Sequence, residues 1–243
     1  MIQAGTATRV INNRLDTWVQ GATKALKATE IRDNLEANAV FLSDGKTPLL
    51  LVNCDLAGLE SDFVAEVREG MSTVARIPPR QILISCTHTH SGPSVIRTNY
   101  LMPLDRDYHL RLKDWLVDLA REAVAAAEPG CVGWARGEAA IGYNRRCCWA
   151  DGTHTMHGDT SRPDFTGLEG PDDHQHLALF VMDPGRKIRA VIYNNTSHPT
   201  HFFSCGIYSA DFPGVVRARL REEFGPIPVL FLNGAFGDMD MDV

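Results

Sequence analysis

Seven short apolar runs, each of strand length and bounded by Gly, Pro, Asn or Asp, constrain the fold of this chain more than any other feature. Several are apolar throughout instead of alternating, which is typical of strands buried on both faces. Three segments with helical periodicity lie among them, at residues 61–76, 107–127 and 209–224. Strands interleaved with helices predict a mixed, multi-layer α/β domain. The apolar runs are residues 37–43, 48–55, 81–87, 131–141, 176–182, 188–195 and 228–233.

The length of 243 residues suits one large domain or two small ones, and we interpret residues 1–243 as one domain. A net charge of −6 without a basic cluster argues against a nucleic-acid partner. No apolar run approaches the ~20 residues of a transmembrane helix. The first 20 residues lack the features of a signal peptide. We therefore expect a cytoplasmic protein, or a secreted one if the true N-terminus is missing, and the oligomeric state stays open.

Polar and ionisable residues collect where four of the apolar runs end. Asp55 ends one run, His88 and His90 follow the next, His198 follows a third, and Asp238 follows the last. In open α/β sheets, ligand sites lie at the carboxyl ends of the strands. The sequence therefore predicts one site at the strand ends, rich in His and Asp.

The His-x-His pair at His88 and His90 places both imidazoles on one side if the backbone stays extended. Such a pair suits a metal site, or one metal ligand beside a group that polarises the substrate. The alternative is a pair of surface or hydrogen-bonded histidines, which a second histidine cluster makes less favourable. In that second cluster Pro199 lies between His198 and His201, so we expect one ligand from it instead of two.

The remaining charged candidates each have two interpretations. Asp55 either orients a ligand imidazole or caps the next turn. Asp238 follows a Gly-rich strand end and is a site candidate, whereas Asp240 and Asp242 suit a solvated acidic end. Arg145 at a strand end can bind a carboxylate or a developing oxyanion, or it is an ordinary surface arginine.

The segment 145–175 is polar and shows little periodicity. A long irregular segment inside a compact domain is often a functional loop or lid.

Several of these motifs together resemble the neutral/alkaline ceramidase family. The stretch "ILISCTHTHSGP" (residues 82–93) resembles the His-Thr-His-Ser-Gly-Pro signature of that family. The likeness continues in the same order over nearly the whole chain. The further matching elements are "AGTATRVIN…WVQG", "AVFLSDGKTPLLLVNCDLAGL", "GYNRR", "NNTSHPT", "SADFPG" and "LNGAFGD".

The resemblance implies a zinc-dependent amidohydrolase that cleaves an N-acyl amide, ceramide or a related lipid amide, by a zinc-activated water. In the family, zinc is held by two His, one Glu and one Tyr. The two histidines correspond to His88 and His198, while His90 and Arg145 correspond to residues that lie against the scissile amide. Gly21 corresponds to a glycine near the substrate.

Two departures from the family keep other functions open. The loop from Asn233 to Asp238 carries no hydroxyl, which disfavours the serine nucleophile proposed for some members. No residue up to Val243 matches the family Glu and Tyr, so we expect an N-terminal portion of a longer catalytic domain. The alternatives are a non-catalytic remnant or binding module and a hydrolase of a non-lipid amide or ester. A metal-independent hydrolase would have to use Cys86, and the expected burial of that thiol argues against it.

Overall fold

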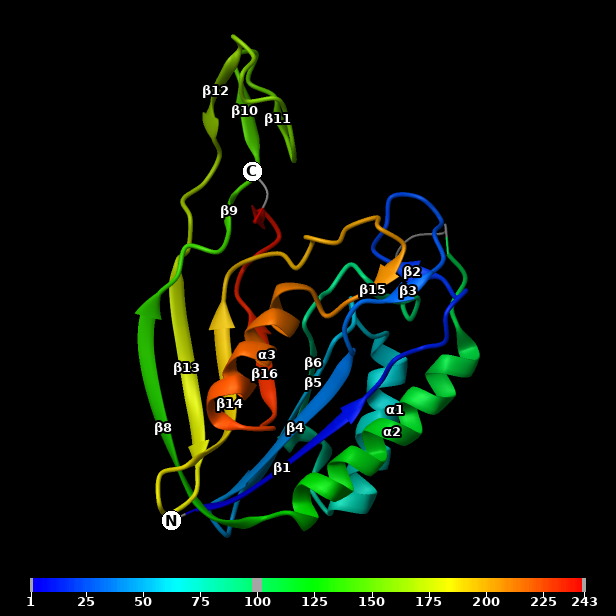
Figure 1. The fold of residues 1–243 in the computed structure, drawn as a ribbon, viewed down its shortest axis with the longest axis vertical. Coiled ribbons are helices and arrows are strands. Elements are labelled where there is room, and N and C mark those ends of the chain that lie inside the picture. The colour runs from blue at the N-terminus through cyan, green and yellow to red at the C-terminus, as the bar shows by residue number, and fades with distance from the viewer. Residues whose placement is uncertain (1, 98–101, 242–243) are drawn as a thin grey trace.

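The computed structural model describes residues 2–97 and 102–241, and an eight-stranded mixed sheet forms its centre (Figure 1). The strands, in their order across the sheet, are β16 (Val229–Asn233), β14 (Ile188–Asn195), β13 (Gln175–Met182), β8 (Glu128–Glu138), β1 (Ile2–Val10), β4 (Glu36–Ser43), β5 (Pro48–Cys54) and β6 (Ile82–Cys86). Neighbours are antiparallel except β14–β16 and β5–β6, which are parallel. All seven apolar runs form strands of this sheet. The eighth strand, β1, has no apolar run and was not predicted.

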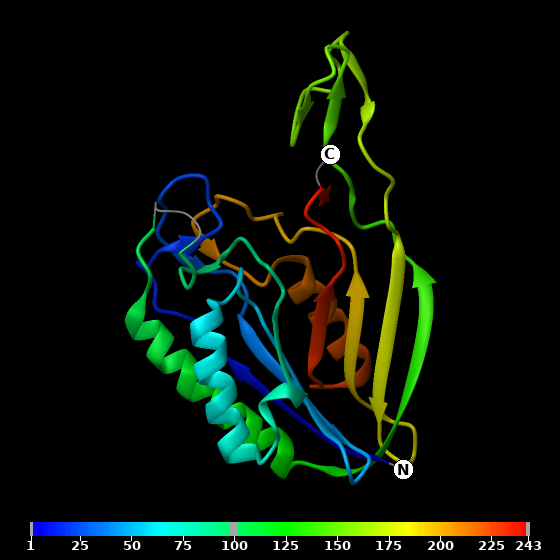
Figure 2. The ribbon, with the colours of Figure 1, turned by 180° about the vertical axis from the view of Figure 1, so that it is seen from behind.

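The three predicted helices are present and cover the outer face of the sheet (Figures 1 and 2). α1 (Ser61–Ala75) and α2 (Arg106–Ala125) pack beside β1, β4 and β5. α3 (Asp211–Phe224) packs on β14 and β16. The Asp105 side chain caps α2 by accepting a hydrogen bond from the Tyr108 amide at 2.9 Å. Ser61 lies inside the first turn of α1 and does not cap the helix.

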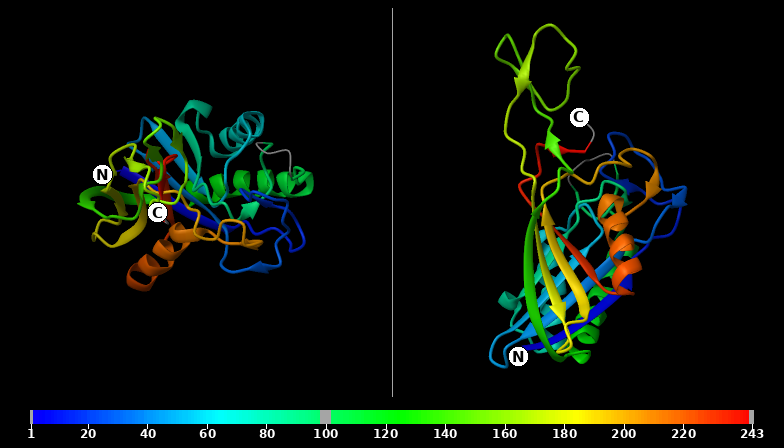
Figure 3. Two further views of the ribbon diagram at one scale, coloured as in Figure 1. Left: turned by 90° about the horizontal axis from the view of Figure 1, so that it is seen from above. Right: turned by 60° about the vertical axis from the view of Figure 1, so that its left-hand side comes forward.

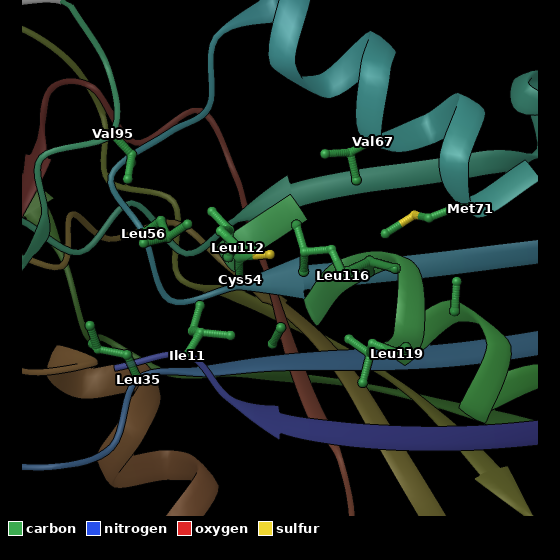
Figure 4. Packing of buried hydrophobic residues seen from close by; sticks show 14 of the residues in the cluster. Ile11, Leu35, Cys54, Leu56, Val67, Met71, Val95, Leu112, Leu116 and Leu119 are labelled. Atoms are coloured by element: carbon green, nitrogen blue, oxygen red, sulfur yellow. The ribbon is translucent and has the colours of Figure 1, made fainter. Parts of the chain in front are cut away.

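The main core lies between α1, α2 and the sheet (Figure 4). Leu112, Leu116 and Leu119 form an apolar stripe on one face of α2 and are fully buried. They meet Met71 of α1 and Cys54 of β5. Burial of each leucine side chain contributes about 2 kcal/mol, so this layer fixes the strands that carry the site.

The sheet curls so that its two ends meet. The Asn53 side chain of β5 donates to the Phe231 carbonyl of β16 at 2.9 Å and accepts from the Phe231 amide at 3.1 Å. At the strand ends, the side chain of Asn233, the last residue of β16, donates to the carbonyl of Thr87, directly after β6, at 2.9 Å. This closure brings the loops after β6, β14 and β16 to one edge.

Short elements complete the fold around that edge. Residues 147–168, which we expected to be irregular, contain a three-stranded sheet that projects from the body (Figure 3). Its strands are β11 (His154–Thr155), β10 (Cys147–Trp149) and β12 (Phe165–Leu168). The other short elements are β2 (Val19–Gln20) paired with β7 (Gly92–Pro93), β3 (Glu30–Ile31) with β15 (Ile207–Tyr208), β9 (Tyr143–Asn144) with β17 (Met239–Asp240), and the 3-10 helix η1 (Pro79–Gln81).

Among the described residues, no helix combines the length and apolar character that a membrane crossing requires.

Candidate functional site

Three histidine side chains converge at the edge where the sheet closes. His88 and His90 lie in the loop after β6, and His198 lies in the loop after β14. One nitrogen of each ring lies within 4.8 Å of the others, and the Nε2 atoms of His90 and His198 are 3.0 Å apart. The centroids of the three rings are 4.9 Å apart in every pair. The rings therefore form one compact cluster.

The backbone of the two loops holds this cluster in place. The His90 amide donates to the Pro199 carbonyl at 3.2 Å, which ties one histidine loop to the other. His88 has a φ of 69°, in the left-handed region that costs a non-glycine residue of order 1 kcal/mol or more. Its amide donates to the Leu56 carbonyl, and its Nδ1 donates to the Ala57 carbonyl at 2.5 Å. This leaves Nε2 of His88 free as a ligand atom.

We expected an extended backbone to place His88 and His90 on one side, but the structure brings their rings together in a different way. β6 ends at Cys86, and the positive φ of His88 turns the chain before His90. Gly21 then closes against His90, because a Cβ atom at Gly21 would lie 2.8 Å from the Cα, Cβ and Cγ atoms of His90. Gly21 also has a φ of 95°, which favours glycine.

Burial keeps all three imidazoles neutral at pH 7. Desolvation and the neighbouring His88 lower the pKa of His90 to about 4. Desolvation, followed by the neighbouring histidines and Arg145, lowers the pKa of His198 to about 3. Desolvation also lowers the pKa of His88, and Arg145 adds to the effect. Neutral imidazoles are the form that binds a metal ion.

The three histidines could hold a metal ion, because one nitrogen of each ring lies within 4.8 Å of the others. Zinc takes nitrogen ligands at about 2.0–2.1 Å in tetrahedral geometry, which places two ligand nitrogens about 3.3 Å apart. The His90–His198 separation of 3.0 Å is close to that spacing. Catalytic zinc sites usually have three protein ligands. The resemblance implies two histidine ligands, His88 and His198, and the structure places a nitrogen of His90 within 4.8 Å of both.

A pocket of about 600 Å³ opens beside the cluster. Arg145 lies in its wall, where Nη1 donates to Asp240 at 2.7 Å and Nη2 donates to the Gly237 carbonyl at 2.8 Å. Nη2 also lies 3.3 Å from Nδ1 of His198. The pocket therefore places a guanidinium beside the imidazoles. Its lining residues are Gly21, His90, Arg145, His157, Thr200, His201, Phe203 and Asp240.

Comparison with solved structures identifies the fold. The neutral ceramidase from Pseudomonas aeruginosa superposes with a TM-score of 0.77 at 18% sequence identity, over 98% of this chain and 39% of that chain. A ceramidase complexed with C2 gives the same TM-score and identity over 99% of this chain and 39% of that chain. This chain has the neutral ceramidase fold. It spans 39% of the length of those solved chains. No protein-family model matches the sequence, and no curated protein matches it.

On the ceramidase fold, the residues singled out from the sequence gather closely. His88, His90 and His198 form the cluster, while Gly21 and Arg145 line the pocket with His90. His201 stays outside the cluster, as the intervening proline suggested, and lines the pocket instead.

Asp238 is placed beside Arg145 instead of in the pocket wall. Its carbonyl accepts from the Arg145 amide at 2.8 Å, and its carboxylate accepts from the Asn144 side chain at 3.0 Å. It therefore supports the backbone that carries Arg145.

Two expectations need correction. Asp55 neither contacts an imidazole nor serves as a simple cap, because it is buried in an ion pair with Arg217 at 2.7 Å. Asp240 is 6% exposed and paired with Arg145, so it is no solvated acidic end. Asp242 lies outside the described residues. Burial raises the pKa of Cys86 to about 12, which leaves it protonated and unsuited to act as a nucleophile.

Proposed function

We propose that this chain carries the metal centre of a zinc-dependent amidohydrolase that hydrolyses an N-acyl amide. The observation that carries the proposal is the meeting of three neutral histidines with Arg145 at one pocket, inside a ceramidase fold. Ceramide or a related lipid amide is the proposed substrate class, and the name of the solved ceramidases supports it.

His88 and His198 are the proposed zinc ligands. His88 is oriented by the Ala57 carbonyl, and His198 lies near the Phe236 carbonyl, which is 3.3 Å from its Nδ1. Such carbonyls fix which ring nitrogen remains available to a metal. When bound, zinc acts as a Lewis acid on a carbonyl and activates water as the nucleophile.

His90 and Arg145 are the proposed catalytic groups. Of the three histidines, His90 lines the pocket, which places its imidazole where a substrate amide can reach it. Its imidazole is neutral at pH 7, because desolvation and the neighbouring His88 lower its pKa to about 4, and a ring N–H can donate a hydrogen bond to a developing oxyanion. Arg145 lines the same pocket, where its guanidinium can stabilise a developing oxyanion.

Metal titration and hydrolysis together test this proposal. We expect the chelator-treated protein to bind zinc, and His88→Ala and His198→Ala each to weaken binding more than about 100-fold, since even outer-shell partners are worth 10–100-fold. His154→Ala, on the projecting sheet, is the matched control and should keep the wild-type affinity. Hydrolysis is measured on N-acyl amides with long and short acyl chains and on a matched ester.

Two outcomes would contradict the proposed metal centre or mechanism, and a third would contradict the proposed substrate. Zinc binding no tighter than millimolar would leave a non-catalytic binding module. Hydrolysis that survives both His88→Ala and metal removal would exclude a zinc mechanism. Cleavage confined to the short-chain amide or the ester would retain the metal centre but refute the lipid substrate.

A further inference from the structure

The carboxylate of Asp240, in the pocket wall, accepts hydrogen bonds at both of its oxygens. One oxygen, Oδ2, accepts from Nη1 of Arg145 at 2.7 Å. The other, Oδ1, accepts from the Thr200 hydroxyl at 2.7 Å and from the Met241 amide at 2.8 Å. The side chains of Arg145 and Asp240 are only 11% and 8% exposed. Both oxygens of a buried carboxylate are therefore engaged, and two of the three partners, Arg145 and Thr200, line the pocket.

The surrounding elements hold the two side chains together. β17 pairs with β9, so Asp240 lies opposite Tyr143, two residues before Arg145. Thr200, which holds the other carboxylate oxygen, is two residues after His198. The Asp240 carboxylate thus links the strand before Arg145, the second histidine loop and the guanidinium itself.

Stability alone is a poor explanation for such an ion pair. Removing two charges from water costs several kcal/mol per ion, and the attraction between them often only offsets that cost. A charged pair with fixed partners does orient its side chains, since charge-assisted hydrogen bonds are short and strongly directional. With Nη1 fixed by Asp240, Nη2 is left beside the Gly237 carbonyl and His198.

We infer that Asp240 is a positioning residue, which fixes the Arg145 guanidinium in the pocket wall so that Arg145 meets the reacting carbonyl. This inference rests on the proposed function. Asp240 is not proposed as a metal ligand, because it is not part of the cluster of ligand atoms.

The test compares Asp240→Asn with Arg145→Ala and with the double variant. Asparagine keeps the shape and the acceptor for Thr200 but removes the charge. Because a misplacement of about 1 Å can cost about 100-fold, we expect kcat to fall about 10- to 100-fold while KM changes less than about threefold. If Asp240 acts through Arg145, Asp240→Asn lowers kcat no further in the Arg145→Ala background. A merely structural loss would add to the effect of Arg145→Ala.

A second readout does not depend on activity. Phenylglyoxal modification of Arg145, followed by mass spectrometry, reports how firmly the guanidinium is held. We expect modification at least about fivefold faster in Asp240→Asn, since a hydrogen bond to a charged group is worth about 1.5–3 kcal/mol. Asp164→Asn is the matched control, because Asp164 also pairs with an arginine, Arg162, at 2.5 Å on the projecting sheet. It should leave both kcat and the reactivity of Arg145 unchanged.

The outcomes separate this inference from the proposed function. If the wild type hydrolyses no amide, the proposed function fails and the modification rate still tests whether Asp240 holds Arg145. Unchanged reactivity in Asp240→Asn, or an additive loss in the double variant, overturns the inference. If Asp240→Asn does not fold, Thr200→Val releases the other carboxylate oxygen and should raise the modification rate of Arg145 to a smaller extent. An unchanged rate in that variant also overturns the inference.

Discussion

Lowering the pH should destabilise the metal-free protein through its buried histidines. In the folded state the pKa of His90 is about 4 and that of His198 about 3. In the unfolded chain both return to about 6.5. At pH 5 the unfolded chain therefore binds a proton at each histidine while the folded chain binds none. Because the unfolded state binds more protons, the free energy of unfolding falls as the pH is lowered from about 6.5.

The magnitude follows from the pKa differences. At pH 5, protonation of one histidine stabilises the unfolded chain by about 2 kcal/mol, from RT ln(1 + 10^(6.5 − 5)). At pH 7 the same contribution is only about 0.2 kcal/mol. Since both histidines are neutral in the folded state at pH 5, their contributions add to about 4 kcal/mol. That is a large part of the stability of a typical domain, about 5–15 kcal/mol.

Urea unfolding at pH 7 and pH 5, in the presence of a chelator, measures this effect. Other groups also titrate; burial raises the pKa of Asp55 and Asp211, which acts in the opposite direction. The informative quantity is therefore the difference between variants. His198→Asn should lose about 2 kcal/mol less than the wild type between the two pH values. His154→Asn is the matched control for removal of a histidine.

The reasoning would be refuted if His198→Asn and the wild type lost the same stability between pH 7 and pH 5. That result would mean that the imidazole of His198 is protonated as readily in the folded protein as in the unfolded chain. The cluster would then be solvated, and its neutral lone pairs would no longer support a metal site at pH 5.

Three further substitutions test the packing around the site. Gly21→Ala should lower stability by about 1–3 kcal/mol and reduce hydrolysis, because the new Cβ meets His90 and the positive φ is strained; an unchanged melting temperature in a thermal scan would contradict the contact. Arg217→Met should cost about 3–5 kcal/mol in urea unfolding, because it leaves the buried Asp55 carboxylate without its arginine, while Glu36 keeps Arg221; a loss below about 1 kcal/mol would mean that Asp55 is hydrated or protonated. Leu116→Ala should cost about 2–5 kcal/mol, whereas Leu110→Ala, 66% exposed on the same helix, should cost little; equal losses would contradict the assigned face of α2.

The elements of the fold could be predicted because their signals are local. The apolar spacing of Leu112, Leu116 and Leu119 specifies one helix face, and the apolar runs specify strands buried on both sides. β1 could not be found in this way, because its sequence IQAGTATRV has few apolar residues. It becomes a central strand because its backbone pairs with β4 and β8, and the local sequence of β1 does not encode that pairing.

The residues of the site could be named from the sequence, but their geometry could not. His88 and His90 are two residues apart, yet their rings converge because of the left-handed backbone at His88 and the bond from the His90 amide to Pro199. Asp240 was misjudged for the same reason. Its arginine partner is 95 residues away in the sequence, and nothing near Asp240 in the chain indicates that its carboxylate is buried.

The same burial that makes the folded protein sensitive to acid also prepares the histidines for a metal. Protons compete with metal ions for imidazole nitrogens, and an unperturbed histidine is about 90% protonated at pH 5.5. With pKa values of about 4 and 3, His90 and His198 keep their lone pairs at that pH. The loss of hydration that lowers these pKa values is a cost of folding, and a bound ion recovers part of it by stabilising the folded state alone. The stability measured at pH 5 and the gain in stability on adding zinc therefore both depend on the burial of these neutral imidazoles. A substitution at His198 that changes one of the two quantities should change the other.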